Sequence, residues 1–193
     1  MPSMIVDANY RFIAASNEVN ARIAQRQQAL ALYVSIVVSL LAATVALRPN
    51  NNASPAPVEW LALGFPVASI SFAFLNYKAE RAITNLRVFL SDLERLGDAN
   101  DHLPSYNTDP KWSLGANKAR RFHDYSVVLL VAAGNAIGLG AAKTIFPQRF
   151  SEAPVFMYIA ILLAFASLLM VLLTPQWSYA PKSAWLQAED ARL

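Results

Sequence analysis

The sequence predicts an all-α polytopic membrane protein, with four transmembrane helices and a cytoplasmic helical hairpin between the second and the third. Three observations support this fold class. Of the 193 residues, 55% are hydrophobic and only 15% are charged, whereas soluble domains average about 25% charged residues. The charges are clustered, which leaves four long stretches without Asp, Glu, Lys or Arg. The basic residues between these stretches are distributed very unevenly, as they are in membrane proteins.

The four apolar stretches have the length of membrane spans. They cover residues 29–47, 60–77, 125–142 and 155–173, which are 19, 18, 18 and 19 residues long. A hydrocarbon core about 30 Å thick needs roughly 20 residues of α-helix, and about 17–25 are tolerated. The rest of the chain is too short to cover four such helices in water. We therefore expect residues 1–193 to form a single membrane domain.

The basic residues predict how the chain is threaded. An even number of spans places residues 1–28, 78–124 and 174–193 on one side, and these segments hold 13 Lys and Arg. The short connectors 48–57 and 143–152 hold only Arg48, Lys143 and Arg149. The positive-inside rule then predicts a multi-pass protein of the bacterial inner (plasma) membrane with both termini in the cytoplasm. Neither connector is long enough for an extracytoplasmic domain.

The cytoplasmic segments read as helices that continue out of the membrane. Residues 17–28 are polar but contain no helix breaker, so we expect an N-terminal helix within residues 1–28 that runs into the first span, with Val19 and Ile23 facing inward. Residues 174–193 form a cytoplasmic tail.

The middle segment, residues 78–124, predicts a helical hairpin. Residues 78–96 contain no Gly or Pro, Gly97 is placed to end the helix, and Thr108-Asp109-Pro110 is typical of a helix start. The first helix has an apolar stripe at helical spacing, formed by Ile83, Leu86, Leu90 and Leu93. A lone amphipathic helix is poorly stable in water, so the stripe needs a partner. The partner is the helix around 112–122, the N-terminal helix, another subunit or a soluble cytoplasmic protein.

The third span carries the residues that predict close helix packing. Gly134 and Gly138 form a GxxxG pattern, and Ala136 with Gly140 repeats the spacing. Small residues four apart let two helix backbones approach closely in lipid. The contact lies either within one chain or between the subunits of a homo-oligomer, and on that basis Gly134→Leu is expected to disrupt assembly. Asn135, in the middle of the span, is expected to line a pore or to bind a neighbouring helix.

Other residue types exclude several classes of protein. No Asp, Glu, Lys, Arg or His lies inside any span, which argues against a proton-coupled transporter, an ion pump or an intramembrane metal site. Cysteine is absent, and no motif of a hydrolase, nucleotide-binding protein or metalloenzyme occurs. We expect no catalytic residue, cofactor or metal. The net charge of +3 is too balanced to suggest binding of nucleic acid.

Basic residues at the inner end of the third span predict contact with the lipid bilayer. Arg120, Arg121 and His123 lie where anionic headgroups are available. The alternative is an enzyme acting on lipid, in which the same residues and Asp124 provide phosphate binding and acid–base chemistry.

The arrangement resembles small bacterial four-helix membrane proteins, the SLATT and S-4TM pore-forming effectors associated with nucleotide-triggered phage defence. The resemblance lies in a polar helix with Asn17-Glu18, Arg22 and Gln25-Arg26 before a membrane hairpin, followed by the helical segment 85–94. It implies an oligomer that opens the inner membrane and transfers no catalytic residues.

Three hypotheses follow. The first is a non-enzymatic homo-oligomeric channel or pore-forming effector of antiviral defence, gated by its cytoplasmic helices. The second is a membrane-anchored structural or adaptor subunit that docks a soluble cytoplasmic partner. The third is the lipid enzyme just described.

Overall fold

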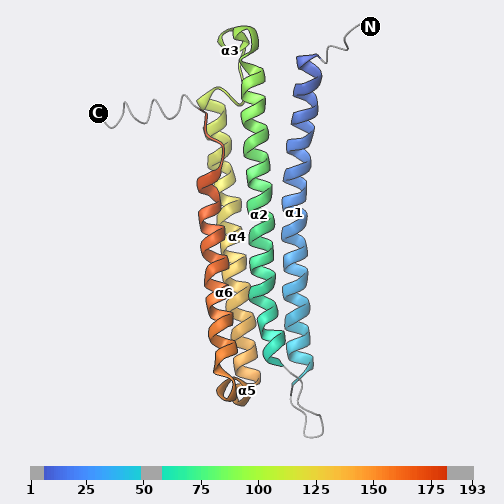
Figure 1. The fold of residues 1–193 in the computed structure, drawn as a ribbon, viewed down its shortest axis with the longest axis vertical. Coiled ribbons are helices and arrows are strands. Elements are labelled where there is room, and N and C mark those ends of the chain that lie inside the picture. The colour runs from blue at the N-terminus through green and yellow to red at the C-terminus, as the bar shows by residue number, and fades with distance from the viewer. Residues whose placement is uncertain (1–6, 49–57, 182–193) are drawn as a thin grey trace, which may run out of the picture. The chain divides into compact units, whose positions relative to one another are not determined.

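The computed structural model describes residues 7–48 and 58–181, and in these ranges the chain is helical and has no strand. The four long helices are α1 (Ala8–Ala46), α2 (Val58–Glu94), α4 (Pro110–Ile145) and α6 (Pro154–Leu173) (Figure 1). Each is long and apolar enough to cross a membrane. This confirms the predicted all-α class and its four apolar helices. Three segments lie outside the described residues: residues 1–6, most of the predicted connector 48–57, and the predicted tail from residue 182.

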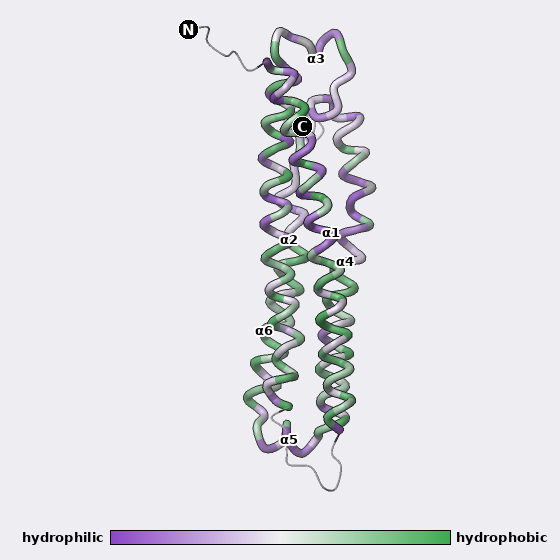
Figure 2. The backbone as a smooth tube through the Cα atoms, turned by 90° about the vertical axis from the view of Figure 1, so that its right-hand side faces the viewer, coloured by the Kyte–Doolittle hydropathy of each residue, from purple (hydrophilic) through white to green (hydrophobic). Residues whose placement is uncertain are grey.

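Three of the long helices extend well beyond the predicted spans. α1, α2 and α4 have 39, 37 and 36 residues, whereas a span needs roughly 20. One part of each is coloured mostly hydrophobic in Figure 2, and the other part is mixed. The expectation that the first three spans continue as helix is therefore confirmed.

The chain forms two compact units. We call residues 27–77 and 124–174 the apolar unit, and the described residues 7–26, 78–123 and 175–181 the polar unit. α1, α2 and α4 each contribute one part to each unit.

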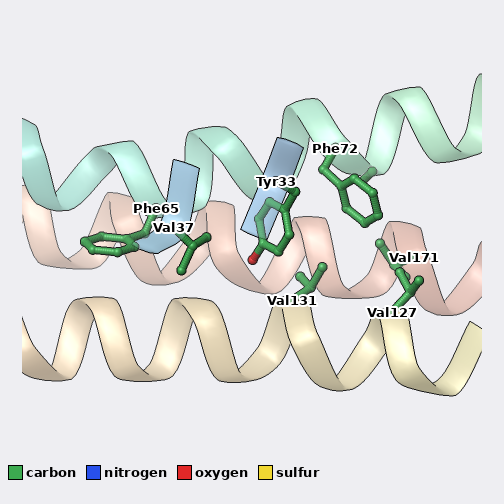
Figure 3. Packing of buried hydrophobic residues seen from close by; sticks show 8 residues of the cluster. Tyr33, Val37, Phe65, Phe72, Val127, Val131 and Val171 are labelled. Atoms are coloured by element: carbon green, nitrogen blue, oxygen red, sulfur yellow. The ribbon is translucent and has the colours of Figure 1, made fainter. Parts of the chain in front are cut away.

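The core of the apolar unit draws on all four long helices. Its main cluster combines aromatic and β-branched side chains (Figure 3): Tyr33 and Val37 of α1, Phe65 and Phe72 of α2, Val127 and Val131 of α4, and Val171 of α6. The rings of Tyr33 and Phe72 stack with their centroids 5.0 Å apart. Many other apolar side chains of this unit are exposed, including Leu129, Ile137 and Leu162, as expected for surfaces that face lipid.

The connector after α4 is more structured than the sequence suggested. Residues 147–152 form a short helix, α5 (Pro147–Glu152), and not a simple loop. Phe146 and Phe150 are both buried in a second apolar cluster with Val58 and Leu139. The two Phe residues lie four apart, so one turn of helix presents both rings to the same side.

Within the polar unit, α2 ends and α4 begins close to the residues predicted to end one helix and to start the next. Gly97 adopts a left-handed conformation with φ of 63°, three residues after the last residue of α2 and within the short helix η1 (Leu96–Asp98). A second short helix, α3 (Ala99–His102), follows in the predicted loop. α4 begins at Pro110, and the carboxylate of Asp109 accepts a hydrogen bond from the backbone N–H of Lys111 at 2.8 Å. This is the expected helix start, with an aspartate cap before proline.

Two glycines of the third span bring helices together inside one chain. A Cβ on Gly134 would lie 2.7 Å from the hydroxyl of Tyr33, and a Cβ on Gly138 would overlap the ring of Phe65. Gly140 has no such neighbour within 4 Å. Gly134 and Gly138 therefore pack α4 against α1 and α2, whereas Gly140 lies on an open side of α4.

This difference predicts opposite effects for one substitution at two positions. Gly138→Ala should lower the free energy of unfolding by about 1–3 kcal/mol, because Phe65 is fully buried and cannot easily move aside. Gly140→Ala should raise it by about 0.5–1 kcal/mol, because alanine favours a helix and has room. Unfolding of the purified protein in mild detergent, followed by circular dichroism, measures both. Equal effects of the two substitutions would contradict the packing described here.

Candidate functional site

A fully buried carboxylate joins three helices of the polar unit. Glu80 of α2 lies just beyond the predicted second span, and its side chain is 0% exposed. Its Oε2 accepts a hydrogen bond from Nη1 of Arg26 in α1 at 3.1 Å. Its Oε1 accepts one from Nη1 of Arg120 in α4 at 2.7 Å. Each of the three helices thus contributes one charge to a single buried ion-pair cluster.

The burial explains why the three charges belong together. A carboxylate removed from water loses several kcal/mol of hydration, which is recovered only through close, well-aligned cationic partners. Arg26 is itself 9% exposed and Arg120 is 19% exposed, so solvent screens neither pair strongly. Removing Glu80 takes away the carboxylate that both arginines bind, and removing either arginine takes one cationic partner from the buried carboxylate.

Arg87 lies seven residues after Glu80 on the same side of α2, and the contacts that hold it in the described part of the chain come from two amide oxygens and an aromatic ring. Its Nε donates to Oδ1 of Asn107 at 3.3 Å, and its Nη1 donates to Oδ1 of Asn117 at 3.2 Å. Its guanidinium lies 4.8 Å from the centre of the Tyr179 ring, a favourable cation–π distance. Among the described residues, its Nη2 has no hydrogen-bond partner.

The environment of Arg87 is unfavourable for a charge. Burial lowers the pKa of Arg87 below the usual value of arginine, and Tyr106 and Tyr179 partly offset that effect. Arginine nevertheless keeps its proton in proteins, because its ordinary pKa lies far above neutral pH. The polar unit therefore contains a buried cation with one unused donor nitrogen.

The loop before α4 is fixed by one carboxylate at the end of α2. Glu94 accepts hydrogen bonds from the backbone N–H groups of Asn107 and Thr108, and also from both of their side chains, at 2.8 to 3.2 Å. The hydroxyl of Tyr179 donates to the carbonyl of Asn107 at 2.8 Å. The backbone carbonyl of Tyr179 accepts a hydrogen bond from Nδ2 of Asn117 at 2.8 Å. Glu94 and Tyr179 thus position the two asparagines that bind Arg87.

These side chains border a cavity of about 560 Å³ in the polar unit. This volume lies within the range of about 300–1,000 Å³ that is usual for small-molecule sites. Among the described residues, its lining includes no acidic side chain but three arginines: Arg26, Arg87 and Arg120. Apolar side chains of α1 and α2 form another part of the wall: Phe12, Val19, Ile23, Ile83 and Leu90.

The predicted apolar stripe contributes to this cavity. Ile83 and Leu90 are buried, and Leu86 and Leu93 are partly buried. Ile83 and Leu90 share the cavity wall with Val19 and Ile23 of α1. Much of the stripe is therefore covered within the chain, and Phe89 is one of the more exposed apolar residues of the segment.

The predicted headgroup residues have different surroundings. Arg120 belongs to the Glu80 cluster, whereas Arg121 is exposed and His123 is partly buried. In the described ranges, no group of three His, Asp or Glu side chains could hold a metal ion.

Asn135 belongs to a polar network inside the apolar unit. Its Nδ2 donates to Oγ of Ser69 at 2.8 Å and to the carbonyl of Val131 at 2.9 Å. Ser69 is also 3.1 Å from the hydroxyl of Tyr33. The structure thus connects Asn135 to Ser69 of α2 and, through Ser69, to Tyr33 of α1.

The sequence interpretation missed Glu80, Arg26 and Arg87, although a signal was present. Glu80, Ile83, Arg87 and Leu90 follow one another at spacings of three, four and three, which places them on one face of a helix. Charged residues within an apolar stripe indicate buried, paired charges. The count of basic residues on each side of the membrane treated Arg26 and Arg87 only as cytoplasmic positive charges.

The chain matches no model of a known protein family, and no curated protein or solved structure is significantly similar to it. The interpretation of the site therefore depends on its chemistry alone.

The Glu80 cluster predicts a large difference between two glutamates. Glu80→Ala should lower the free energy of unfolding by about 3–5 kcal/mol, because it removes the buried carboxylate that both Arg26 and Arg120 bind. Glu18→Ala is the control, since Glu18 forms a half-exposed pair with Arg22 one helical turn away and should cost about 0.5 kcal/mol or less. Chemical unfolding followed by circular dichroism gives both values. An equal decrease in the free energy of unfolding for both variants would show that the buried ion pairs stabilise the fold no more than the exposed pair does.

Proposed function

We propose that the chain is a non-enzymatic protein of the bacterial inner membrane that assembles into a homo-oligomeric channel or pore. In this proposal, the polar unit lies in the cytoplasm and controls opening. The apolar unit spans the membrane through the four apolar helices. The proposal agrees with the arrangement of the pore-forming effectors that the sequence resembles.

The observation that carries the proposal is the open side of α4. Ala132, Ala136, Gly140 and Thr144 follow one another every four residues, and the last three are exposed. Nothing lies within 4 Å of the position that a Cβ on Gly140 would take. Such a row of small residues allows the close helix–helix approach that drives association in lipid. Since Gly134 and Gly138 are occupied within the chain, this second row is available to another copy.

The interior of one chain favours a pore between copies over one through a single bundle. Aromatic and β-branched side chains fill the main cluster of the apolar unit. Asn135, the strongest polar group of the third span, is buried and bound to Ser69. A conducting path needs polar groups or wide dimensions, so we place it where several copies meet.

The continuity of the helices supports control by the polar unit. α1, α2 and α4 are each one uninterrupted helix with residues in both units. Shifts of about 1–2 Å in helix packing are a common means of switching membrane and soluble proteins. The adaptor alternative has less support, because much of its docking stripe is buried.

Assembly and conduction are tested by one substitution on the open side of α4. Ala136→Leu should reduce the oligomer to smaller species in mild detergent, because leucine prevents close approach of a second helix. It should also abolish the K⁺ efflux from proteoliposomes that we expect of the wild type. Light scattering after size-exclusion chromatography and a fluorescent flux assay provide the two measurements.

The matched control is Ala166→Leu, the same change at an exposed position of α6. It should leave both oligomer size and efflux unchanged. A monomeric wild type, or a wild type that passes no ions, would refute the proposal. Loss of membrane potential and growth arrest on induced expression would support it in cells.

The orientation is tested by cysteine labelling, because the chain contains no cysteine of its own. Asn85→Cys, an exposed residue of the polar unit, should react with a membrane-impermeant maleimide only after cells are permeabilised. Gln148→Cys, an exposed residue of α5, should react in intact cells. The reverse pattern would place the polar unit outside the cytoplasm.

A further inference from the structure

We propose that the cavity of the polar unit binds a small amphiphilic organic anion, with a phosphate or carboxylate group on Arg87 and an apolar body against α1 and α2. The inference does not depend on conduction, because ligand binding is measured on its own.

The first argument is the incomplete pairing of Arg87. This side chain is 9% exposed and lines the cavity. Its Nε and Nη1 are directed by two amide oxygens, and the Tyr179 ring supports the guanidinium plane. Its Nη2 has no acceptor in the part of the chain that the structure describes. A buried cationic donor without an acceptor is costly, and an anion removes that cost.

The second argument is the balance of charge around the cavity. Arg26, Arg87 and Arg120 line it, and the carboxylate of Glu80 is shared between Arg26 and Arg120. Glu94 lies at the end of the same helix segment, but the Asn107–Thr108 backbone and side chains occupy its oxygens. Arg26 and Arg120 bind the carboxylate of Glu80, whereas Arg87 binds amide oxygens and an aromatic ring, so Arg87 is the cation of the cavity that attracts an anion.

The third argument concerns the rest of the ligand. The apolar wall formed by α1 and α2 offers nothing to a bare inorganic ion, and a volume of about 560 Å³ far exceeds one phosphate group. An apolar or aromatic body would cover this wall and release water from it. The polar side chains Ser16, Asn20 and Asn117 in the lining could accept or donate hydrogen bonds to its linking atoms.

Two sources supply this chemistry: a single-chain lipid phosphate or a soluble organic phosphate. The test uses the full chain in nanodiscs of neutral phosphatidylcholine and isothermal titration calorimetry. The probes are phenyl phosphate, a short-chain lysophosphatidic acid and inorganic phosphate. We expect one or both organic probes to bind at least ten-fold more tightly than inorganic phosphate. Preference for lysophosphatidic acid assigns a lipid-derived ligand, and preference for phenyl phosphate assigns a soluble one.

Three variants test whether the organic probes bind in the cavity. Arg87→Gln should weaken the better organic probe at least ten-fold. Arg81→Gln, which removes an exposed charge from the same helix, should bind as the wild type does. Ala116→Trp keeps every charge but fills the cavity from α4, and it should also abolish binding. If Arg87→Gln loses its helical circular dichroism and therefore does not fold, Ala116→Trp alone tests whether the probe binds in the cavity.

Four outcomes would overturn the inference. The first is that neither organic probe binds the wild type. The second is that inorganic phosphate binds as tightly as the organic probes. The third is that Arg81→Gln weakens binding as much as Arg87→Gln. The fourth is that the Ala116→Trp protein binds normally.

Discussion

The buried carboxylate of Glu80 is the interaction on which the polar unit depends. It is bound by Arg26 of α1 and by Arg120 of α4, so it fixes how these helices are aligned along α2. An apolar contact tolerates sliding of one helix past another, but a fully buried ion pair does not, because a shift exposes uncompensated charge to a low-dielectric interior. The position of Arg87, and with it the cationic side of the cavity, follows from this alignment.

The apolar unit is held together by different means. Lipid provides no hydrophobic force that drives helices together, so close packing and a few hydrogen bonds must do so. Gly134 and Gly138 provide the close packing. Tyr33, Ser69 and Asn135 provide a polar link among α1, α2 and α4. The same three helices are thus held together mainly by buried ion pairs in the polar unit and mainly by close packing in the apolar unit.

The sequence predicted features that depend on neighbouring residues. The lengths of the apolar runs predicted the four long helices, and Gly97 and Asp109 predicted where α2 ends and α4 begins, because these signals are local. Partner choice is not local: nothing adjacent to Glu80 says that Arg26, 54 residues earlier, will bind it. Arg120 was likewise assigned to lipid on its position alone. Even so, the spacing of Glu80 and Arg87 within the apolar stripe held enough information to predict burial, though not the partners.

The placement of Tyr179 has a consequence for biogenesis. Its ring covers Arg87, its hydroxyl binds Asn107 and its carbonyl binds Asn117, yet it follows α6 in the chain. A ribosome has therefore made all four apolar helices before this side chain exists. The polar unit cannot be completed during translation in chain order, as many domains are. The contacts of Tyr179 to Arg87, Asn107 and Asn117 can therefore form only after the last apolar helix has been synthesised.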